Sequence, residues 1–139
     1  MKQREPVSKI MTAELTTVNI TNSLKEVKNI FREKKIRHLP VVSGDTVIGI
    51  LSETDIRRLS FGSNFGEAHA EADEAILDML SINQVMRDNP VTIDSKETIK
   101  AAAEKLSHAE FHALPVTEDG KLVGIVTTTD LIKYLLDQY

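Results

Sequence analysis

The sequence predicts an α+β fold made of two β-α-β-β-α repeats that pack with pseudo-two-fold symmetry. The leading observation is an internal repeat, because an offset of 75 residues aligns ten identical positions without a gap. The identical pairs are Met11/Met86, Thr17/Thr92, Lys25/Lys100, Leu39/Leu114, Pro40/Pro115, Val41/Val116, Gly49/Gly124, Ile50/Ile125, Thr54/Thr129 and Asp55/Asp130. Two copies of so long a period favour half-domains around one axis over a solenoid. A single repeat of roughly 55 residues would be only marginally stable by itself, so we expect the two repeats to share one hydrophobic core.

The second observation is that both copies change their hydrophobic pattern in the same order. β-branched residues predict a short strand, cap-forming triplets at 20–22 and 94–96 open a helix, and two apolar strands and a second helix follow. The expected strands are 16–18, 39–42 and 47–51 in the first copy and 91–93, 114–117 and 122–126 in the second, with second helices from Thr54 and Thr129. The first helices carry apolar stripes at Leu24, Val27, Ile30 and Phe31 and at Ile99, Ala102, Ala103 and Leu106. Pro40 and Pro115 should lie at a strand start or edge, since proline has no N–H to donate.

We expect repeat one at 7–60, a linker helix at 61–81 and repeat two at 82–137. Gly62 and Gly66 break the chain before the helical segment, and His69 is expected to be solvated. The apolar stripe of the linker helix is expected to pack on the body or on a partner subunit, since a flexible linker would be rich in Gly and Ser. This stripe consists of Ala68, Ala72, Ala75, Ile76, Met79 and Leu80.

Composition argues against several classes of function. A net charge of −4, with four Phe, two Tyr and no Trp, gives neither an electrostatic footprint nor a stacking platform for nucleic acid. The chain has no cysteine, which fits a reducing cytosol and removes thiolate zinc sites and cysteine nucleophiles. The amino terminus has no apolar signal-peptide core, and no apolar run approaches the roughly 18 residues of a membrane span. We therefore expect a cytoplasmic protein with no membrane or nucleic-acid partner.

The strongest local motif is G-x-x-[ST]-x-T-D, which occurs in VIGILSETD (47–55) and in LVGIVTTTD (122–130). The glycine permits close approach of a ligand or of neighbouring backbone. Hydroxyls at Ser52 and Thr127 and carboxylates at Asp55 and Asp130 could hold a ribose or phosphate at a helix start. Plain helix capping is the alternative and is favoured for a single copy. Occurrence at matched places in both copies strengthens the ligand interpretation, but capping also repeats.

The second motif is IRHLPVV (36–42), with its counterpart FHALPVT (111–117). Arg37, His38 and His112 precede a buried strand, where cations could neutralise a phosphate. The alternative is a solvated helix C-terminus, which we assign to Lys34 and Lys35 and leave open for the others.

A metal or catalytic site has little support in the sequence. His108 and His112 are four residues apart, as in a zinc pair, but no third ligand and no H-E-x-x-H glutamate accompany them. No P-loop and no Ser-His-Asp arrangement is visible. We therefore expect no enzymatic activity and no catalytic cofactor.

Taken together, the repeat, the I-M-T opening, the R-H-L-P-V-V strand and the duplicated G-x-x-[ST]-x-T-D resemble a tandem CBS-domain pair, or Bateman module. The resemblance implies two halves packed sheet to sheet, with clefts that take AMP, ADP, ATP or S-adenosylmethionine as a regulatory ligand. It implies that Asp55 and Asp130 hold ribose hydroxyls. The other positions it implies are Ser52, Thr54, Thr127 and Thr129 for ribose or phosphate; Thr17, Val18, Thr92 and Ile93 for the adenine edge; Arg37, His38 and His112 for phosphate; and Pro40 and Pro115 on the neighbouring strands.

The opening and the linker most resemble the acetoin-utilisation type of CBS pair, without the further C-terminal domain of that type. The resemblance implies a homodimer that signals to a regulated protein by conformational change. A S-adenosylmethionine sensor, a structural dimerisation unit with empty clefts and a metal-dependent hydrolase are the alternatives. Because repeat one has Arg37-His38 where repeat two has His112-Ala113, we expect two unequal sites.

Overall fold

The computed structural model describes residues 4–59 and 70–139, and its contacts divide them into two compact units. The first-repeat unit comprises 16–44, 48–59 and 70–89, and the second-repeat unit comprises 4–15, 45–47 and 90–139. Each contains one complete β-α-β-β-α repeat apart from a hairpin tip at 45–47, so the predicted α+β class is confirmed.

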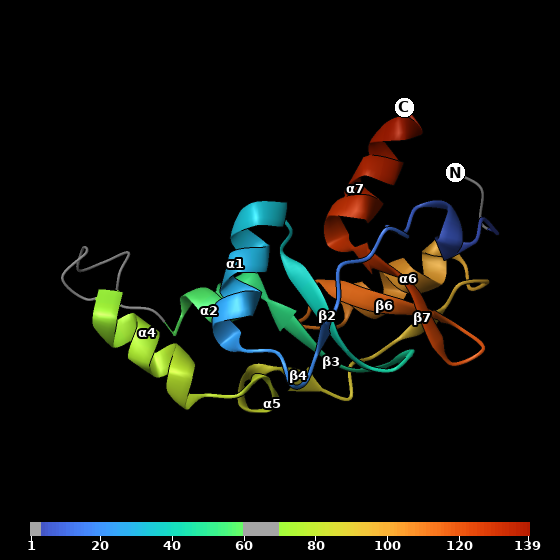
Figure 1. Ribbon diagram of the computed structural model, residues 1–139. Coiled ribbons are helices and arrows are strands. Elements are labelled where there is room, and N and C mark those ends of the chain that lie inside the picture. The colour runs from blue at the N-terminus through green and yellow to red at the C-terminus, as the bar shows by residue number, and fades with distance from the viewer. Residues whose placement is uncertain (1–3, 60–69) are drawn as a thin grey trace. The chain divides into compact units, whose positions relative to one another are not determined.

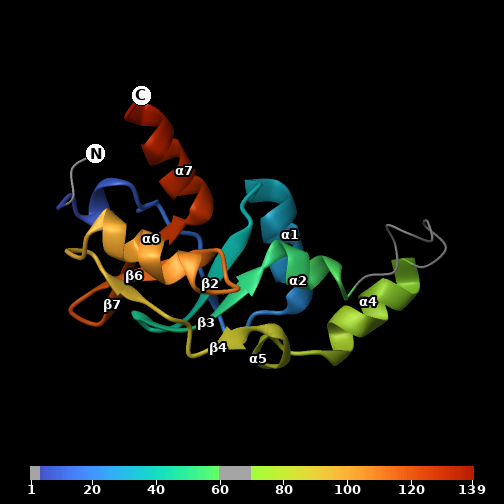
Figure 2. The ribbon, with the colours of Figure 1, turned by 180° about the vertical axis from the view of Figure 1, so that it is seen from behind.

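The first-repeat unit is built on a four-stranded sheet in the order β1-β2-β3-β4. Strand β1 pairs in parallel with β2, and β3 pairs antiparallel with β4. Helices α1 and α2 lie side by side over β2 and β3 in both views (Figures 1 and 2). The elements are β1 (Val18–Asn19), α1 (Leu24–Lys34), β2 (His38–Ser43), β3 (Thr46–Ser52), α2 (Glu53–Arg57), α4 (Ala70–Met79), α5 (Ile82–Val85) and β4 (Arg87–Asp88).

The second-repeat unit is built on a three-stranded sheet in the order β5-β6-β7. Strand β5 is parallel to β6, and β6 forms an antiparallel hairpin with β7. Figure 2 shows α6 lying along β6, and α7 (red) leaving the end of β7. The elements are η1 (Val7–Lys9), β5 (Ile93–Asp94), α6 (Ile99–Ser107), β6 (Ala113–Glu118), β7 (Lys121–Thr127) and α7 (Thr128–Asp137).

Each first helix buries the apolar face that its sequence predicts. Leu24, Val27 and Phe31 of α1 are buried, as are Ile99, Ala102 and Leu106 of α6. Each fully buried aliphatic side chain contributes roughly 1.5–3 kcal/mol by leaving water. These faces join the strand residues in one apolar core per unit.

The predicted cap triplets at 20–22 and 94–96 are wrong, because the N-caps are Ser23 and Thr98. The Ser23 hydroxyl accepts from the Glu26 N–H at 3.1 Å, and the Glu26 carboxylate accepts from the Ser23 N–H at 3.1 Å. The Ser23 N–H, the Asn22 side-chain amide and the Ser23 hydroxyl donate to the Glu26 carboxylate, and these bonds hold the pKa of Glu26 below its usual value. The Asn22 side chain also accepts from the Asn19 N–H at 2.7 Å. It therefore closes the turn before the helix, which is a common use of asparagine.

The segment that opens each repeat packs in the unit of the other repeat. Val7, the first residue of repeat one, is fully buried in the second-repeat core, and its N–H donates to the Glu97 carbonyl at 2.7 Å. Thr12 exchanges two backbone hydrogen bonds with Ile125, at 2.8 and 3.0 Å. Conversely, Ile82 is fully buried in the first-repeat core, where β4 extends the sheet. The opening segment of each repeat thus completes the core of the other repeat. We call these two segments, 7–12 and 82–87, the exchanged segments.

The exchange explains why Gly49 and Gly124 are glycines. A Cβ at Gly49 would overlap the Met86 Sδ and lie 3.2 Å from the Arg87 carbonyl oxygen. A Cβ at Gly124 would overlap the Met11 Sδ in the same way. Of the two interpretations of this glycine, close approach of the neighbouring segment is the one observed. The identical Met11 and Met86 are its partners.

Pro40 and Pro115 lie at the third residue of β2 and β6, which are internal strands and not sheet edges. Pro115 stands opposite Ile125, whose N–H and carbonyl both point away to Thr12. The proline nitrogen therefore faces β5, and pairing with β5 begins only at Val116. No ladder bond is lost, which is why an internal strand tolerates this proline.

The linker helix was expected at 61–81, and α4 occupies 70–79 of this range. Its predicted stripe is right at Leu80, which packs against the first-repeat core, and wrong at Ala75 and Met79, which are exposed; the buried residue, Leu77, was not in it. Leu77 joins the first-repeat core, and Asp78 forms a 3.1 Å ion pair with Lys25 of α1. Gly62, Gly66, Ala68 and His69 lie outside the described residues.

Candidate functional site

The first candidate site lies where β3 passes into α2. Ser52 is the N-cap of α2, and its hydroxyl accepts from the Asp55 N–H at 3.0 Å. The Asp55 carboxylate is one-fifth exposed and lies between two guanidinium groups. Its Oδ1 is 3.8 Å from an Arg58 nitrogen, and its Oδ2 is 3.7 Å from the Arg87 Nε. Thr54 is exposed beside it.

The matching site lies where β7 passes into α7. Thr127 is the N-cap, and its Oγ1 accepts from the Asp130 N–H at 3.2 Å. The Asp130 Oδ2 accepts in return from the Thr127 N–H at 2.9 Å. This reciprocal capping box is the alternative that the sequence left open, and it occupies one of the two carboxylate oxygens. Within the described ranges Asp130 has no ion pair, and Thr129 is exposed.

In both units the residue before the central strand contacts the start of the second helix. The Arg37 carbonyl accepts from the Glu53 N–H at 2.8 Å. The His112 carbonyl accepts from the Thr128 N–H at 3.0 Å and from the Thr128 hydroxyl at 3.3 Å. The structure therefore brings together the two motifs that the sequence singled out separately. The side chains of Arg37 and His112 are exposed, and His38 is half-buried.

The residues expected at the adenine edge lie at the same end of each sheet. Val18 is buried opposite Val41, which places Thr17 level with Pro40. Ile93 is buried opposite Val116, which places Thr92 level with Pro115, and Thr127 pairs with Ala113 on the other side of β6. The Thr92 carbonyl already accepts from the Lys105 Nζ at 2.9 Å.

Sequence reasoning missed Arg58 and Arg87. Arg58 had a detectable signal, because the matching place in repeat two is Lys133, also a cation. Arg87 had none, because its counterpart is Thr12 and its contact with Asp55 depends on the exchanged segment. The two candidate sites therefore differ in charge for a reason that only the fold reveals.

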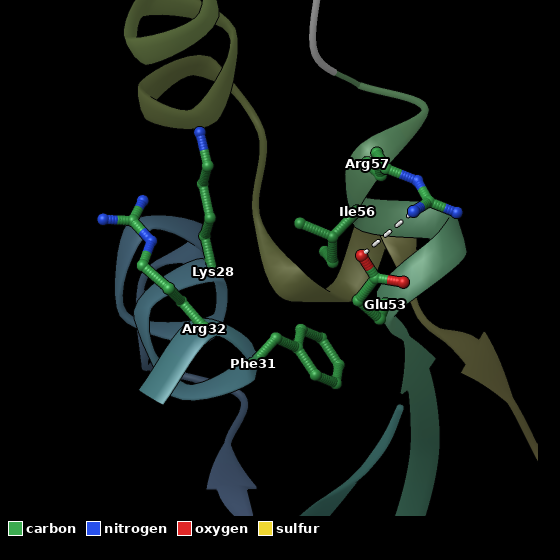
Figure 3. Close-up of a pocket in the computed structure, with 6 residues that line it drawn as sticks. All are labelled: Lys28, Phe31, Arg32, Glu53, Ile56 and Arg57. Atoms are coloured by element: carbon green, nitrogen blue, oxygen red, sulfur yellow. Dashed lines mark ion pairs between the residues drawn. The ribbon is translucent and has the colours of Figure 1, made fainter. Parts of the chain in front are cut away.

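A separate groove of about 300 Å³ lies between α1 and α2 (Figure 3). Phe31 and Ile56 form its apolar part, and Glu53 and Arg57 form an ion pair of 3.6 Å at its rim. Lys28 and Arg32 complete the lining. None of the candidate site residues lines this groove.

The structure separates His108 from His112, the pair considered for zinc. Helix α6 ends at Ser107, with His108 as its C-cap, so His108 and His112 do not share a helix face. Over 4–59 and 70–139, no group of three or more His, Asp or Glu side chains could hold a metal ion. Helix starts, hydroxyls and carboxylates of this kind suit hydrogen bonding to a polar ligand.

The chain belongs to the CBS domain family, whose model matches residues 7–62 and 82–137. A CBS domain-containing protein of Dictyostelium discoideum is 30% identical over 132 residues, covering 94% of this chain and 90% of that protein. Homoserine O-acetyltransferase of Methanohalobium evestigatum is also 30% identical, over 93% of this chain. This chain spans only 24% of the acetyltransferase, so the likeness concerns a CBS pair within a longer enzyme.

Solved CBS pairs share the fold over nearly the whole chain. CBSX2 of Arabidopsis thaliana in complex with AMP superposes with a TM-score of 0.77 at 26% identity, covering 96% of this chain and 98% of CBSX2. A CBS pair in complex with 5′-methylthioadenosine and S-adenosyl-L-methionine gives the same four values. AcuB of Vibrio cholerae, assigned to acetoin utilisation, has the same fold at a TM-score of 0.75 and 23% identity, over 96% of this chain and 91% of AcuB.

Among the described residues, no helix is both long and apolar enough to cross a membrane.

Proposed function

We propose that this chain is a non-catalytic regulatory module that binds an adenine nucleotide, namely AMP, ADP or ATP, at the helix starts of its two repeats. Binding shifts the conformation of the module, and a partner protein reads that shift. The module acts as a homodimer in the cytoplasm. The ligand is a regulatory effector and not a cofactor.

The observation that carries the proposal is the same local arrangement in both units. Each has a hydroxyl and a carboxylate three residues apart at the start of the second helix, and each links that start to the residue before the central strand. In repeat two the capping box leaves the Asp130 Oδ1 able to accept from a ribose hydroxyl. Capping and ribose binding are therefore compatible at the same aspartate.

The comparisons support an adenosine-containing ligand, because structures with this fold were solved with AMP and with S-adenosyl-L-methionine. We assign Asp55 and Asp130 to the ribose, with Ser52, Thr54, Thr127 and Thr129 contacting ribose or phosphate. Arg37, His38 and His112 are assigned to phosphate, and Thr17, Val18, Thr92 and Ile93 to the adenine edge beside Pro40 and Pro115.

Two alternatives remain distinguishable by experiment. A S-adenosylmethionine sensor is favoured by the relative solved with that ligand. A purely structural dimerisation unit is favoured by the observation that both aspartates already have protein partners.

The test is a thermal-shift panel with AMP, ADP, ATP and S-adenosylmethionine on the wild type and on Asp55→Asn/Asp130→Asn. A nucleotide at about 100 times its dissociation constant adds roughly 2.7 kcal/mol, or on the order of 5 °C in melting temperature. The N-caps Ser52 and Thr127 are unchanged, and an asparagine at 130 still has an amide oxygen that can accept from the Thr127 N–H, so the double variant should melt near wild type without ligand. It should lose most of the nucleotide-induced shift, because the charged acceptor is gone.

The matched control is Asp45→Asn/Asp137→Asn, which removes the same charge at two exposed positions. It should keep the full shift. A double variant at 55 and 130 that melts well below wild type yet binds nucleotide normally would show that both aspartates are structural. A shift with S-adenosylmethionine alone would select the sensor, and no shift with any of the four ligands would select the dimerisation unit.

A further inference from the structure

The two candidate sites differ at a position supplied by the exchanged segments. In the first-repeat unit this position is Arg87, which pairs with Ile50 in the β3–β4 ladder. The preceding residue, Met86, packs against Gly49, and this contact fixes the chain just before Arg87. Strand and side-chain packing together hold the Arg87 backbone next to the end of β3. The Arg87 guanidinium, about half exposed, then lies 3.7 Å from Asp55.

In the second-repeat unit the same position is Thr12. Its backbone is held equally firmly, by the two hydrogen bonds to Ile125 and by Met11 against Gly124. The side chain it presents is short and neutral. Lys133, which matches Arg58, forms no ion pair with Asp130 among the residues described. Asp130 therefore lacks the pair of cations that surrounds Asp55.

This difference changes what a ligand must do at each carboxylate. At Asp130 a ribose hydroxyl meets an oxygen with no cationic competitor. At Asp55 a ribose hydroxyl must compete with two guanidinium groups, which lie 3.8 and 3.7 Å from the two carboxylate oxygens. A nucleoside has no anionic group for these guanidinium groups to bind. A nucleoside phosphate provides a charged acceptor that suits the planar donor groups of an arginine.

We propose that Arg87 is a specificity-determining residue of the first-repeat site, where it selects phosphorylated adenosines over unphosphorylated ones. The second-repeat site, with Thr12 in its place, accepts neutral adenosines. The inference rests on the proposed function and deepens it, because it assigns different ligand classes to the two repeats. It also makes the opening of repeat two part of the binding site of repeat one.

The test measures AMP and adenosine binding by calorimetry, with one site weakened at a time. Asp130→Asn weakens the second-repeat site, and Arg87→Thr is then added, since threonine is the residue at the matching place. Loss of a charge-assisted phosphate bond weakens AMP roughly 10- to 100-fold. Adenosine should bind as before or a few times more tightly, because Arg87 no longer competes with the ribose for the Asp55 carboxylate. The AMP-to-adenosine affinity ratio should therefore fall at least tenfold.

The reciprocal variant, Thr12→Arg in an Asp55→Asn background, should raise the same ratio at the second-repeat site. Arg57→Thr is the matched control, because Arg57 is exposed and forms its ion pair with Glu53, away from both aspartates, and it should leave the ratio unchanged. Melting without ligand checks that each variant folds.

An unchanged ratio in Arg87→Thr, with AMP still bound, overturns the role of Arg87 and leaves the proposed function standing. Equal losses for AMP and adenosine make Arg87 a structural residue and also overturn the inference. Failure of the wild type to bind either ligand overturns the proposed function and the inference together.

Discussion

The contact between Gly124 and Met11 allows a quantitative test of the exchanged segments. A methyl group at position 124 would overlap the Met11 Sδ and lie 2.9 Å from the Met11 Cγ and 3.1 Å from the Thr12 carbonyl oxygen. The Met11 side chain packs against the second-repeat core, which limits how far it can move, and the Thr12 oxygen is held by the Ile125 N–H at 3.0 Å. Overpacking costs about 1–3 kcal/mol, so Gly124→Ala should cost about 1–2 kcal/mol. For a chain of this length that is a loss of roughly 3–8 °C in melting temperature.

Thermal and urea unfolding of the wild type, Gly124→Ala, Met11→Ala and the double variant measure this coupling. Shortening Met11 removes the two closest contacts and leaves the 3.1 Å approach to the Thr12 carbonyl oxygen, so the double variant should be only slightly less stable than Met11→Ala alone. The expected coupling free energy is about 1–2 kcal/mol, within the range seen for residues in contact. Gly49→Ala and Met86→Ala repeat the cycle in the other unit. Strictly additive effects, or a Gly124→Ala protein that melts like wild type, would refute the packing argument.

Two further predictions concern local hydrogen bonds in the second-repeat unit. The Tyr134 hydroxyl donates to the Glu5 carboxylate, and this bond, with burial and the Glu5 charge, raises the pKa of Tyr134 above its ordinary value of 10.0. Since the folded-state pKa lies above the unfolded one, the stabilisation is fully present below pH 10.0 and is lost as the pH rises through the raised pKa. Tyr134→Phe should therefore melt below wild type at pH 8, and the difference in melting temperature should disappear above pH 10. A difference that stays constant across that range would contradict this. Thr98→Ala removes the cap bond from the Ala101 N–H, at 3.0 Å, and should lower the free energy of unfolding in urea by about 1 kcal/mol. Thr98→Ser keeps a hydroxyl and should retain most of the stability. Equal losses in the two variants would contradict the cap assignment.

The sequence alone determined the repeated elements, because each depends on residues close together in the chain. Helical spacing at Leu24, Val27 and Phe31 identifies the face of α1 that is buried. Ser, Thr and Asp at 52–55 and 127–130 mark helix starts for the same local reason. Because the same motifs occur at matching places in both repeats, chance is a poor explanation for them. They indicated the CBS domain family, which the comparisons confirm.

The tertiary structure decided which segments cover these faces. A hydrophobic pattern shows that a face needs a partner, but it does not say which part of the chain provides it. The sequence could not place Val7 in the core of repeat two, or Leu77 of the linker helix in the core of repeat one. It also could not bring Arg87 to Asp55. These contacts join residues that are more than 20 positions apart, so they arise from packing the whole unit and leave no local trace in the sequence.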